Sequence, residues 1–215
     1  MRNLFVAGAS TGCLHPFGEF MSFPHFATAA RALTASVVLA GFAFAQPAAA
    51  APYARVLPEK STLAFVSNQM GVSVDGSFKR FTATLDFDPA KPEAGKATLD
   101  IDMASIDAGG PEANDEVKGK NWFDVKQFAA ARFVSSSVKP LGGNRYEARG
   151  QMTIRGKSRE VVAPFTLKPE GAGAVLEGGF QLKRLDYGIG TGAWGDTSVV
   201  ADEVQIKFRL TVAGK

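Results

Sequence analysis

Apolar and polar residues alternate along most of the chain beyond residue 60. Between residues 81 and 87 every second position is apolar, and Thr82, Thr84 and Asp86 lie between them. The same alternation recurs over 97–103 and 204–210. Successive side chains of a strand point to opposite faces, so this pattern is typical of half-buried antiparallel strands. Five further segments have strand character: Thr62–Ser67, Arg132–Lys139, Tyr146–Ile154, Arg159–Leu167 and Ala174–Leu182.

One stretch breaks this rhythm. Residues 111–126 are rich in Glu, Asp, Lys and Asn, which predicts a short helix followed by a loop. Glycine-rich turns at 142–144 and 155–157 are typical of β-hairpins. Roughly eight strands with one helical insertion predict an all-β fold, an antiparallel barrel that closes on itself and leaves no exposed sheet edge. A barrel of about eight strands is just wide enough to hold one slender ligand.

The N-terminal segment predicts secretion. An apolar run over 32–45 follows Arg31 and precedes an Ala-rich segment at 48–51, which is the arrangement of a signal peptide. The run is too short to span a bilayer, which takes about 20 residues. We expect cleavage after Ala50, which would leave a single domain of residues 51–215 in the periplasm. Residues 1–20 do not form a normal basic leader, so Met21 is an alternative start.

The distribution of His and Cys restricts the chemistry. Cys13, His15 and His25 are the only residues of these types, and all lie in the predicted signal peptide. Residues 51–215 therefore cannot form a Ser-His-Asp or Cys-His pair, an ordinary zinc site, or a His- or Cys-ligated haem or iron–sulfur site. We expect a protein that is not an enzyme and has no catalytic residue, metal or cofactor. The 24 basic and 21 acidic residues nearly balance, so no basic patch indicates nucleic-acid binding.

Two local motifs have simpler interpretations than the chemistry they suggest. Residues 190–195 match G-x-G-x-x-G, but strand pattern rather than a helix follows, so we interpret the segment as a turn near the barrel mouth. Asp100 and Asp102 could form a hydrolase pair. They alternate with apolar Leu99, Ile101 and Met103, however, so we expect both carboxylates to face solvent.

The inward positions are rich in phenylalanine. The chain has 17 Phe against 3 Tyr and 2 Trp, and Phe supplies apolar area without a polar group. Such an interior is either a packed core or the wall of an apolar pore, and the pattern does not choose between them. If it is a pore, we expect its lining to include Phe65, Phe81, Leu85, Phe87, Leu99, Ile101, Phe133, Phe165 and Phe180. The residues expected at its mouth are Gln69, Trp122, Phe123, Tyr187 and Trp194.

Over nearly its whole length, the predicted domain resembles the YceI-like family of secreted lipid-binding proteins. No single motif is specific, but seven occur in the family's order. They are Ser61–Phe65, Met70–Phe78, Leu85–Pro89, Asp115–Asp124, Ala131–Ser135, Gly150–Gly156 and Leu182–Gly190.

The resemblance implies an eight-stranded lipocalin-like barrel with an elongated apolar pore. It also implies a periplasmic carrier whose ligand is a polyprenyl chain, an isoprenoid quinone or another long-chain amphiphile. The Gln69-Met-Gly and Trp122-Phe segments are similar to a subset associated with cytochrome b561, which implies a membrane protein of that type as partner and leaves a homodimer open. Many members of the family have His where this chain has Lys60 and Gln69. The family's contacts to a ligand head group are therefore the part of the resemblance that carries over least to this chain.

A different class of function also fits the sequence. In this alternative, the barrel is filled by its own side chains. The protein would then be a non-enzymatic accessory of a membrane electron-transfer or stress-response system.

Overall fold

The computed structural model describes residues 52–214. The predicted signal peptide, the alternative start at Met21, and Cys13, His15 and His25 all lie outside the described residues. Within 52–214, no helix is long and apolar enough to cross a membrane. Strands dominate this part of the chain, and one α-helix, α1 (Pro111–Lys118), occupies the start of the stretch that breaks the alternation.

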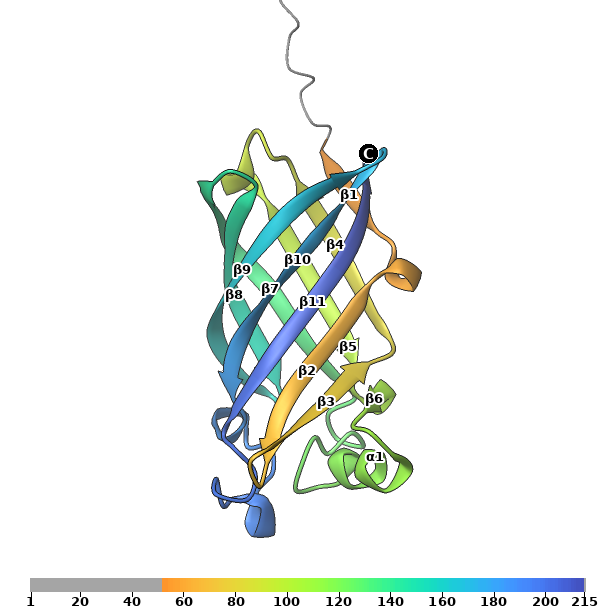
Figure 1. Ribbon diagram of the computed structural model, residues 1–215, viewed down its shortest axis with the longest axis vertical. Coiled ribbons are helices and arrows are strands. Elements are labelled where there is room, and N and C mark those ends of the chain that lie inside the picture. The colour runs from red at the N-terminus through yellow and green to blue at the C-terminus, as the bar shows by residue number, and fades with distance from the viewer. Residues whose placement is uncertain (1–51, 215) are drawn as a thin grey trace, which may run out of the picture. The chain divides into compact units, whose positions relative to one another are not determined.

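The strands form one sheet that closes on itself (Figure 1). Their order is β1-β4-β5-β7-β8-β9-β10-β11-β2-β3-β6, and each neighbouring pair is antiparallel. The sheet closes because β11 pairs with β10 on one edge and with both β1 and β2 on the other. The strands are β1 (Tyr53–Val56), β2 (Thr62–Gln69), β3 (Val72–Phe78), β4 (Phe81–Phe87), β5 (Lys96–Asp102), β6 (Ile106–Asp107), β7 (Ala130–Gly142), β8 (Arg145–Ile154), β9 (Lys157–Glu170), β10 (Gly173–Lys183) and β11 (Glu203–Gly214).

The eleven strands make a closed barrel of eight long strands, as predicted. Three of the long strands are interrupted, so each of these three consists of two shorter pieces. β1 and β2 lie end to end along the same edge of β11. β4 pairs with β1 while β3 pairs with β2, and β5 pairs with β4 while β6 pairs with β3. Each of the eight segments predicted from the sequence lies in a different one of these long strands. The alternation found one piece of each interrupted strand but missed the other pieces, β1, β3 and β6.

Serine hydroxyls replace ladder hydrogen bonds where the strands break or bulge. Ser105 accepts a hydrogen bond from Arg80 N (3.0 Å) and donates to Asp102 O (2.7 Å), so one buried hydroxyl joins two breaks. Ser61 accepts from Thr211 N (3.0 Å) in the break between β1 and β2. Ser135 accepts from Ala97 N (2.8 Å) at a bulge in β7. Backbone groups in an apolar wall must be paired, and these serines pair groups that the ladder leaves over.

The two ends of the barrel differ (Figure 1). Both chain ends of the described part and the hairpin turns β7–β8 and β9–β10 lie at one end, which we call the closed end. There Phe87, Tyr146 and Phe165 form a cluster with ring centroids 5.1–5.9 Å apart. The β2–β3 hairpin, α1 and the long β10–β11 connection lie at the other end, which we call the mouth. The two longest connections, from β6 to β7 and from β10 to β11, therefore both lie at the mouth.

Replacing Ser105 by alanine should destabilise the barrel by about 0.5–1.5 kcal/mol, because the Arg80 N–H loses the buried hydroxyl that accepts its hydrogen bond. Urea unfolding followed by circular dichroism measures this. Ser136→Ala is the control, since its exposed hydroxyl contacts only Arg149 O. Equal unfolding free energies for the two variants would show that the break at Ser105 does not need the hydroxyl.

Candidate functional site

The barrel encloses a cavity of about 450 Å³. This size falls within the range of about 300–1,000 Å³ that is typical of pockets for small molecules. Side chains from all eight long strands line it, and most of them are apolar, although Gln69, Glu116 and Arg184 are among the lining residues. A slender hydrophobic ligand could therefore lie along the barrel with its surface removed from water.

Most of the residues expected to line a pore do line this cavity. Eight of the nine are Phe65, Leu85, Phe87, Leu99, Ile101, Phe133, Phe165 and Phe180. Phe81 is buried beside Ile101 across the β4–β5 pair but is not part of the lining. β11 adds the inward residues of its own alternation, which the predicted lining left out: Val204, Ile206, Phe208 and Leu210.

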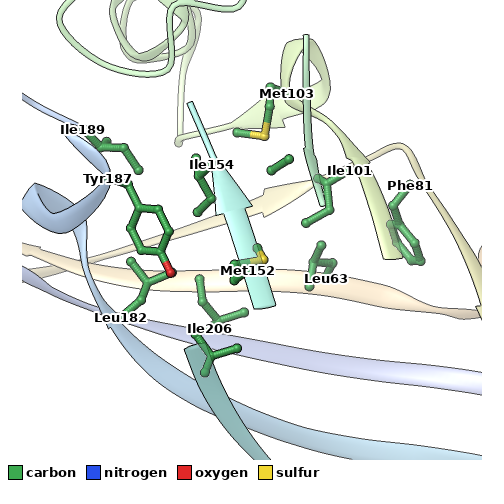
Figure 2. Close-up of a cluster of buried hydrophobic side chains, with 12 residues drawn as sticks. Leu63, Phe81, Ile101, Met103, Met152, Ile154, Leu182, Tyr187, Ile189 and Ile206 are labelled. Carbon is green, nitrogen blue, oxygen red and sulfur yellow. The ribbon is translucent and has the colours of Figure 1, made fainter. Parts of the chain in front are cut away.

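A cluster of buried apolar residues on the mouth side of the barrel forms part of the cavity wall (Figure 2). It joins Leu63, Met152 and Ile206 from three strands. Tyr187 projects into this cluster from the β10–β11 connection, with its hydroxyl toward Leu182. That hydroxyl is buried and has no hydrogen-bond partner within the described residues, and burial raises the pKa of the phenol. The phenol is therefore neutral near neutral pH and supports the wall of the cavity without lining it.

The other four residues expected at the mouth, Gln69, Trp122, Phe123 and Trp194, line the cavity. The side chain of Gln69 forms no hydrogen bond within residues 52–214, so its amide is free to contact a ligand. Lys60 lies exposed in a short 3-10 helix (Pro58–Lys60) and does not line the cavity. Of Lys60 and Gln69, only Gln69 could therefore contact a molecule in the cavity.

Glu116 on α1 holds the two tryptophans of the mouth together. Its Oε1 accepts hydrogen bonds from Trp194 Nε1 (2.7 Å) and Trp122 Nε1 (3.2 Å). The two indole rings lie 5.5 Å apart between centroids. This carboxylate connects the helix after β6 to the connection before β11, two segments that the ladder does not join.

Arg184 fixes the β10–β11 connection from inside. It is only 2 % exposed, and its five N–H groups donate to five backbone carbonyls, at 2.7–3.1 Å. These carbonyls belong to Ile189, Gly190, Trp194, Val200 and Ala201. The guanidinium carbon also lies 5.9 Å from the Trp122 ring. Burial lowers the pKa of Arg184 while nearby Asp202 opposes this shift, but a guanidinium remains charged in proteins.

The two motifs that suggested other chemistry take structural roles. Residues 190–195 form an irregular segment with a short 3-10 helix (Gly192–Trp194), and no parallel sheet surrounds them. Asp100 lies on the outer face with Arg132, and Asp102 binds Arg80. Within residues 52–214, no three His, Cys, Asp or Glu side chains come together in a way that could hold a metal ion.

The alternation did not indicate either Arg184 or Glu116. Arg184 follows the last alternating residues of β10 and reads as an exposed charge. Its acceptors are backbone carbonyls of an irregular segment. Every residue has such a carbonyl, so the sequence of that segment does not indicate the contact. Both residues do lie in two of the seven segments on which the resemblance rests, 115–124 and 182–190.

Comparison with known proteins agrees with this geometry. The sequence model of the YceI-like domain matches residues 55–212. A UPF0312 protein of Pseudomonas savastanoi pv. phaseolicola is 32 % identical over 171 residues, which cover 75 % of this chain and 85 % of that protein.

Solved structures share the fold. The crystal structure of Burkholderia cenocepacia BcnA matches with a TM-score of 0.71 and 48 % identity, over 73 % of this chain and 99 % of that one. A polyisoprenoid-binding domain from Saccharophagus degradans matches with a TM-score of 0.58 and 15 % identity, over 77 % of this chain and 99 % of that one. At this identity the second likeness concerns the fold alone.

Arg184→Met and Arg184→Lys should both lower the free energy of unfolding, by about 3 kcal/mol or more, because buried carbonyls lose their donors. Lysine should not rescue the protein, since an ammonium has three donors and cannot reach five acceptors. Urea unfolding followed by tryptophan fluorescence gives the values. The exposed neighbour Lys183, changed to Met, is the control. A stable Arg184→Lys variant would show that the five contacts are not needed.

Proposed function

This chain belongs to the YceI-like domain family, and from that premise we propose that it binds one isoprenoid lipid, or another long-chain amphiphile, inside the barrel. The observation that carries the proposal is the continuous apolar cavity of about 450 Å³. An apolar chain gains about 25 cal/mol for each Å² of surface that leaves water. Burying a few hundred Å² would give several kcal/mol, which supports micromolar binding or better after the costs of association.

The proposed role is that of a periplasmic carrier without catalytic activity. The periplasmic location rests on the signal-peptide pattern in residues 31–51, and the absence of an enzymatic role rests on the lack of His and Cys after residue 50. The description of the Saccharophagus degradans domain as polyisoprenoid-binding supports the ligand class. Gln69 is the proposed contact for a carbonyl or hydroxyl head group, since its free amide lines the cavity.

The membrane partner is a separate proposal. The Gln69-Met-Gly and Trp122-Phe segments are the reason to propose a cytochrome b561-type protein as the source or acceptor of the lipid. An accessory role with a filled barrel is the alternative, and the open cavity favours the carrier over it.

Protein purified from its native host without detergent should contain a ligand. We expect native mass spectrometry to show about one additional small molecule per chain, and an organic extract to contain a mass typical of a prenyl chain. Repeated preparations with an empty barrel, which also fail to bind an added prenyl lipid, would favour the accessory role.

A charge placed on the cavity wall should abolish binding, because an unpaired charge is very costly in an apolar interior. Leu85→Glu and Ile101→Lys introduce such charges into the lining. Asp100→Asn is the matched control on the adjacent outward position, where its exposed ion pair with Arg132 contributes little. Retention of a prenyl lipid is the measurement, with circular dichroism to report folding.

A second variant separates loss of the cavity from loss of the fold. Ala148→Phe places an apolar ring from β8 in part of the cavity, and should leave a folded barrel that retains less lipid. If Asp100→Asn lost the ligand while Ala148→Phe and Ile101→Lys bound normally, the ligand would not lie in this cavity.

A further inference from the structure

The tip of the β2–β3 hairpin exposes two apolar side chains. Met70 is 72 % exposed and Val72 is 65 % exposed, more than any other large apolar residue within 52–214. Single exposed apolar residues are common on proteins and need no explanation. These two lie at the mouth of the barrel, however, and the backbone of one of them is unfavourable (Figure 1).

The conformation of the turn does not suit methionine. Met70 has φ 48° and Gly71 has φ 78°, so two successive residues lie in the left-handed region. Two-residue hairpin turns of this kind favour Asn, Asp or Gly at the first position. Methionine therefore stabilises neither the turn nor a core at this position. This indicates that its side chain contacts something other than the rest of this chain.

The tip continues the wall of the cavity. Val72 lies on the same face of β3 as Val74, which lines the cavity, and Gln69 lines it from the opposite strand. Backbone hydrogen bonds tie the tip to the β10–β11 connection: Met70 N donates to Val199 O (2.8 Å), and Gln69 forms a bridge with Val200. Val200 also lines the cavity. The exposed Val72 and Met70 therefore lie directly beyond the cavity wall formed by Gln69, Val74 and Val200.

The size and charge of the tip point to its partner. Two side chains are far too few for a stable protein interface, which buries about 1,200–2,000 Å². A bilayer, in contrast, needs no large complementary surface, and even one acyl anchor binds it only weakly and reversibly, so two inserted side chains would give brief contact. Asp75 is the only charged residue over 61–78, so the hairpin has no basic cluster that would select anionic lipids.

We propose that the β2–β3 hairpin tip docks the barrel on a lipid bilayer by inserting Met70 and Val72, which brings the mouth of the cavity to the acyl chains. This inference rests on the proposed function, since a carrier must take its lipid from a membrane. Docking of this kind is apolar and transient, so it depends little on salt or on the charge of the lipid.

The test compares the double variant Met70→Asn, Val72→Thr with the parent and with Leu141→Asn. Leu141 is the matched control, because it is 46 % exposed beside the β7–β8 turn at the closed end. Three quantities are measured: flotation with phosphatidylcholine vesicles, the rate of uptake of dansyl-tagged geranylgeraniol from those vesicles, and affinity for the same probe in vesicle-free solution.

We expect the double variant to lose flotation and to take up the probe about tenfold more slowly, which corresponds to the apolar area of roughly one side chain. Its affinity in solution should remain within about twofold of the parent, and its fold should be as stable or more stable because Asn suits the turn. Leu141→Asn should match the parent throughout, and raising the salt from about 0.05 M to about 0.5 M should change little.

The outcomes separate the two proposals. Unchanged uptake and flotation in a double variant that binds the probe in solution would overturn docking and leave the carrier function standing. A parent that binds no probe in solution would contradict the carrier function, and flotation alone would then decide the docking surface. A dimer that the double variant abolishes, without flotation of the parent, would show that a second copy occupies the tip and would overturn the proposal.

Discussion

Backbone pairing around an apolar space is the constraint on which this structure depends. A cavity without water offers no partner to a free N–H or C=O, and each unpaired group there costs free energy. Closing the sheet solves most of this problem, since β11 holds β10 on one edge and β1 with β2 on the other. Side chains pair the backbone groups that closure of the sheet leaves without a partner. Ser61, Ser105 and Ser135 do so at breaks and bulges, and Arg184 does so at the mouth.

Alternation predicts the fold well because a one-sided barrel wall imposes it on every strand. Each of the eight long strands contains one predicted segment. β3 was not among the predicted segments, although Val72, Val74 and Phe78 alternate with polar residues. Its inward position Gly76 interrupts the apolar set, because a Cβ there would clash with the edge of the Phe65 ring. β1 and β6 have only four and two residues, too few to show any period.

In the candidate site, too, residues on regular strands could be predicted from the sequence and residues in irregular segments could not. Its apolar lining could be predicted since inward residues of regular strands follow the alternation, and only Phe81 among the nine does not line the cavity. Arg184 and Glu116 could not, because their partners are backbone carbonyls and indole N–H groups in irregular segments. Contacts of that kind depend on the final path of the chain. Family resemblance included both residues in its segments but said nothing of what they contact.

The asymmetry of the two ends determines where a ligand can enter. At the closed end, β1 pairs with both neighbours, and the rings of Phe87, Tyr146 and Phe165 pack against one another, so a passage there would have to break the ladder and the core. At the mouth, α1 and the segment after it contact the β10–β11 connection without strand pairing: through Glu116, Trp122 and Trp194, and through one backbone hydrogen bond from Thr191 N to Asn121 O (2.9 Å). Side-chain hydrogen bonds on partly exposed groups can break and re-form without unfolding the sheet. Arg184 keeps the connection folded while those contacts change, because its five carbonyl partners all lie within the connection itself. The wall and the mouth are thus held by different interactions, and in the proposed carrier an apolar chain would enter where the mouth contacts, not the ladder, have to break.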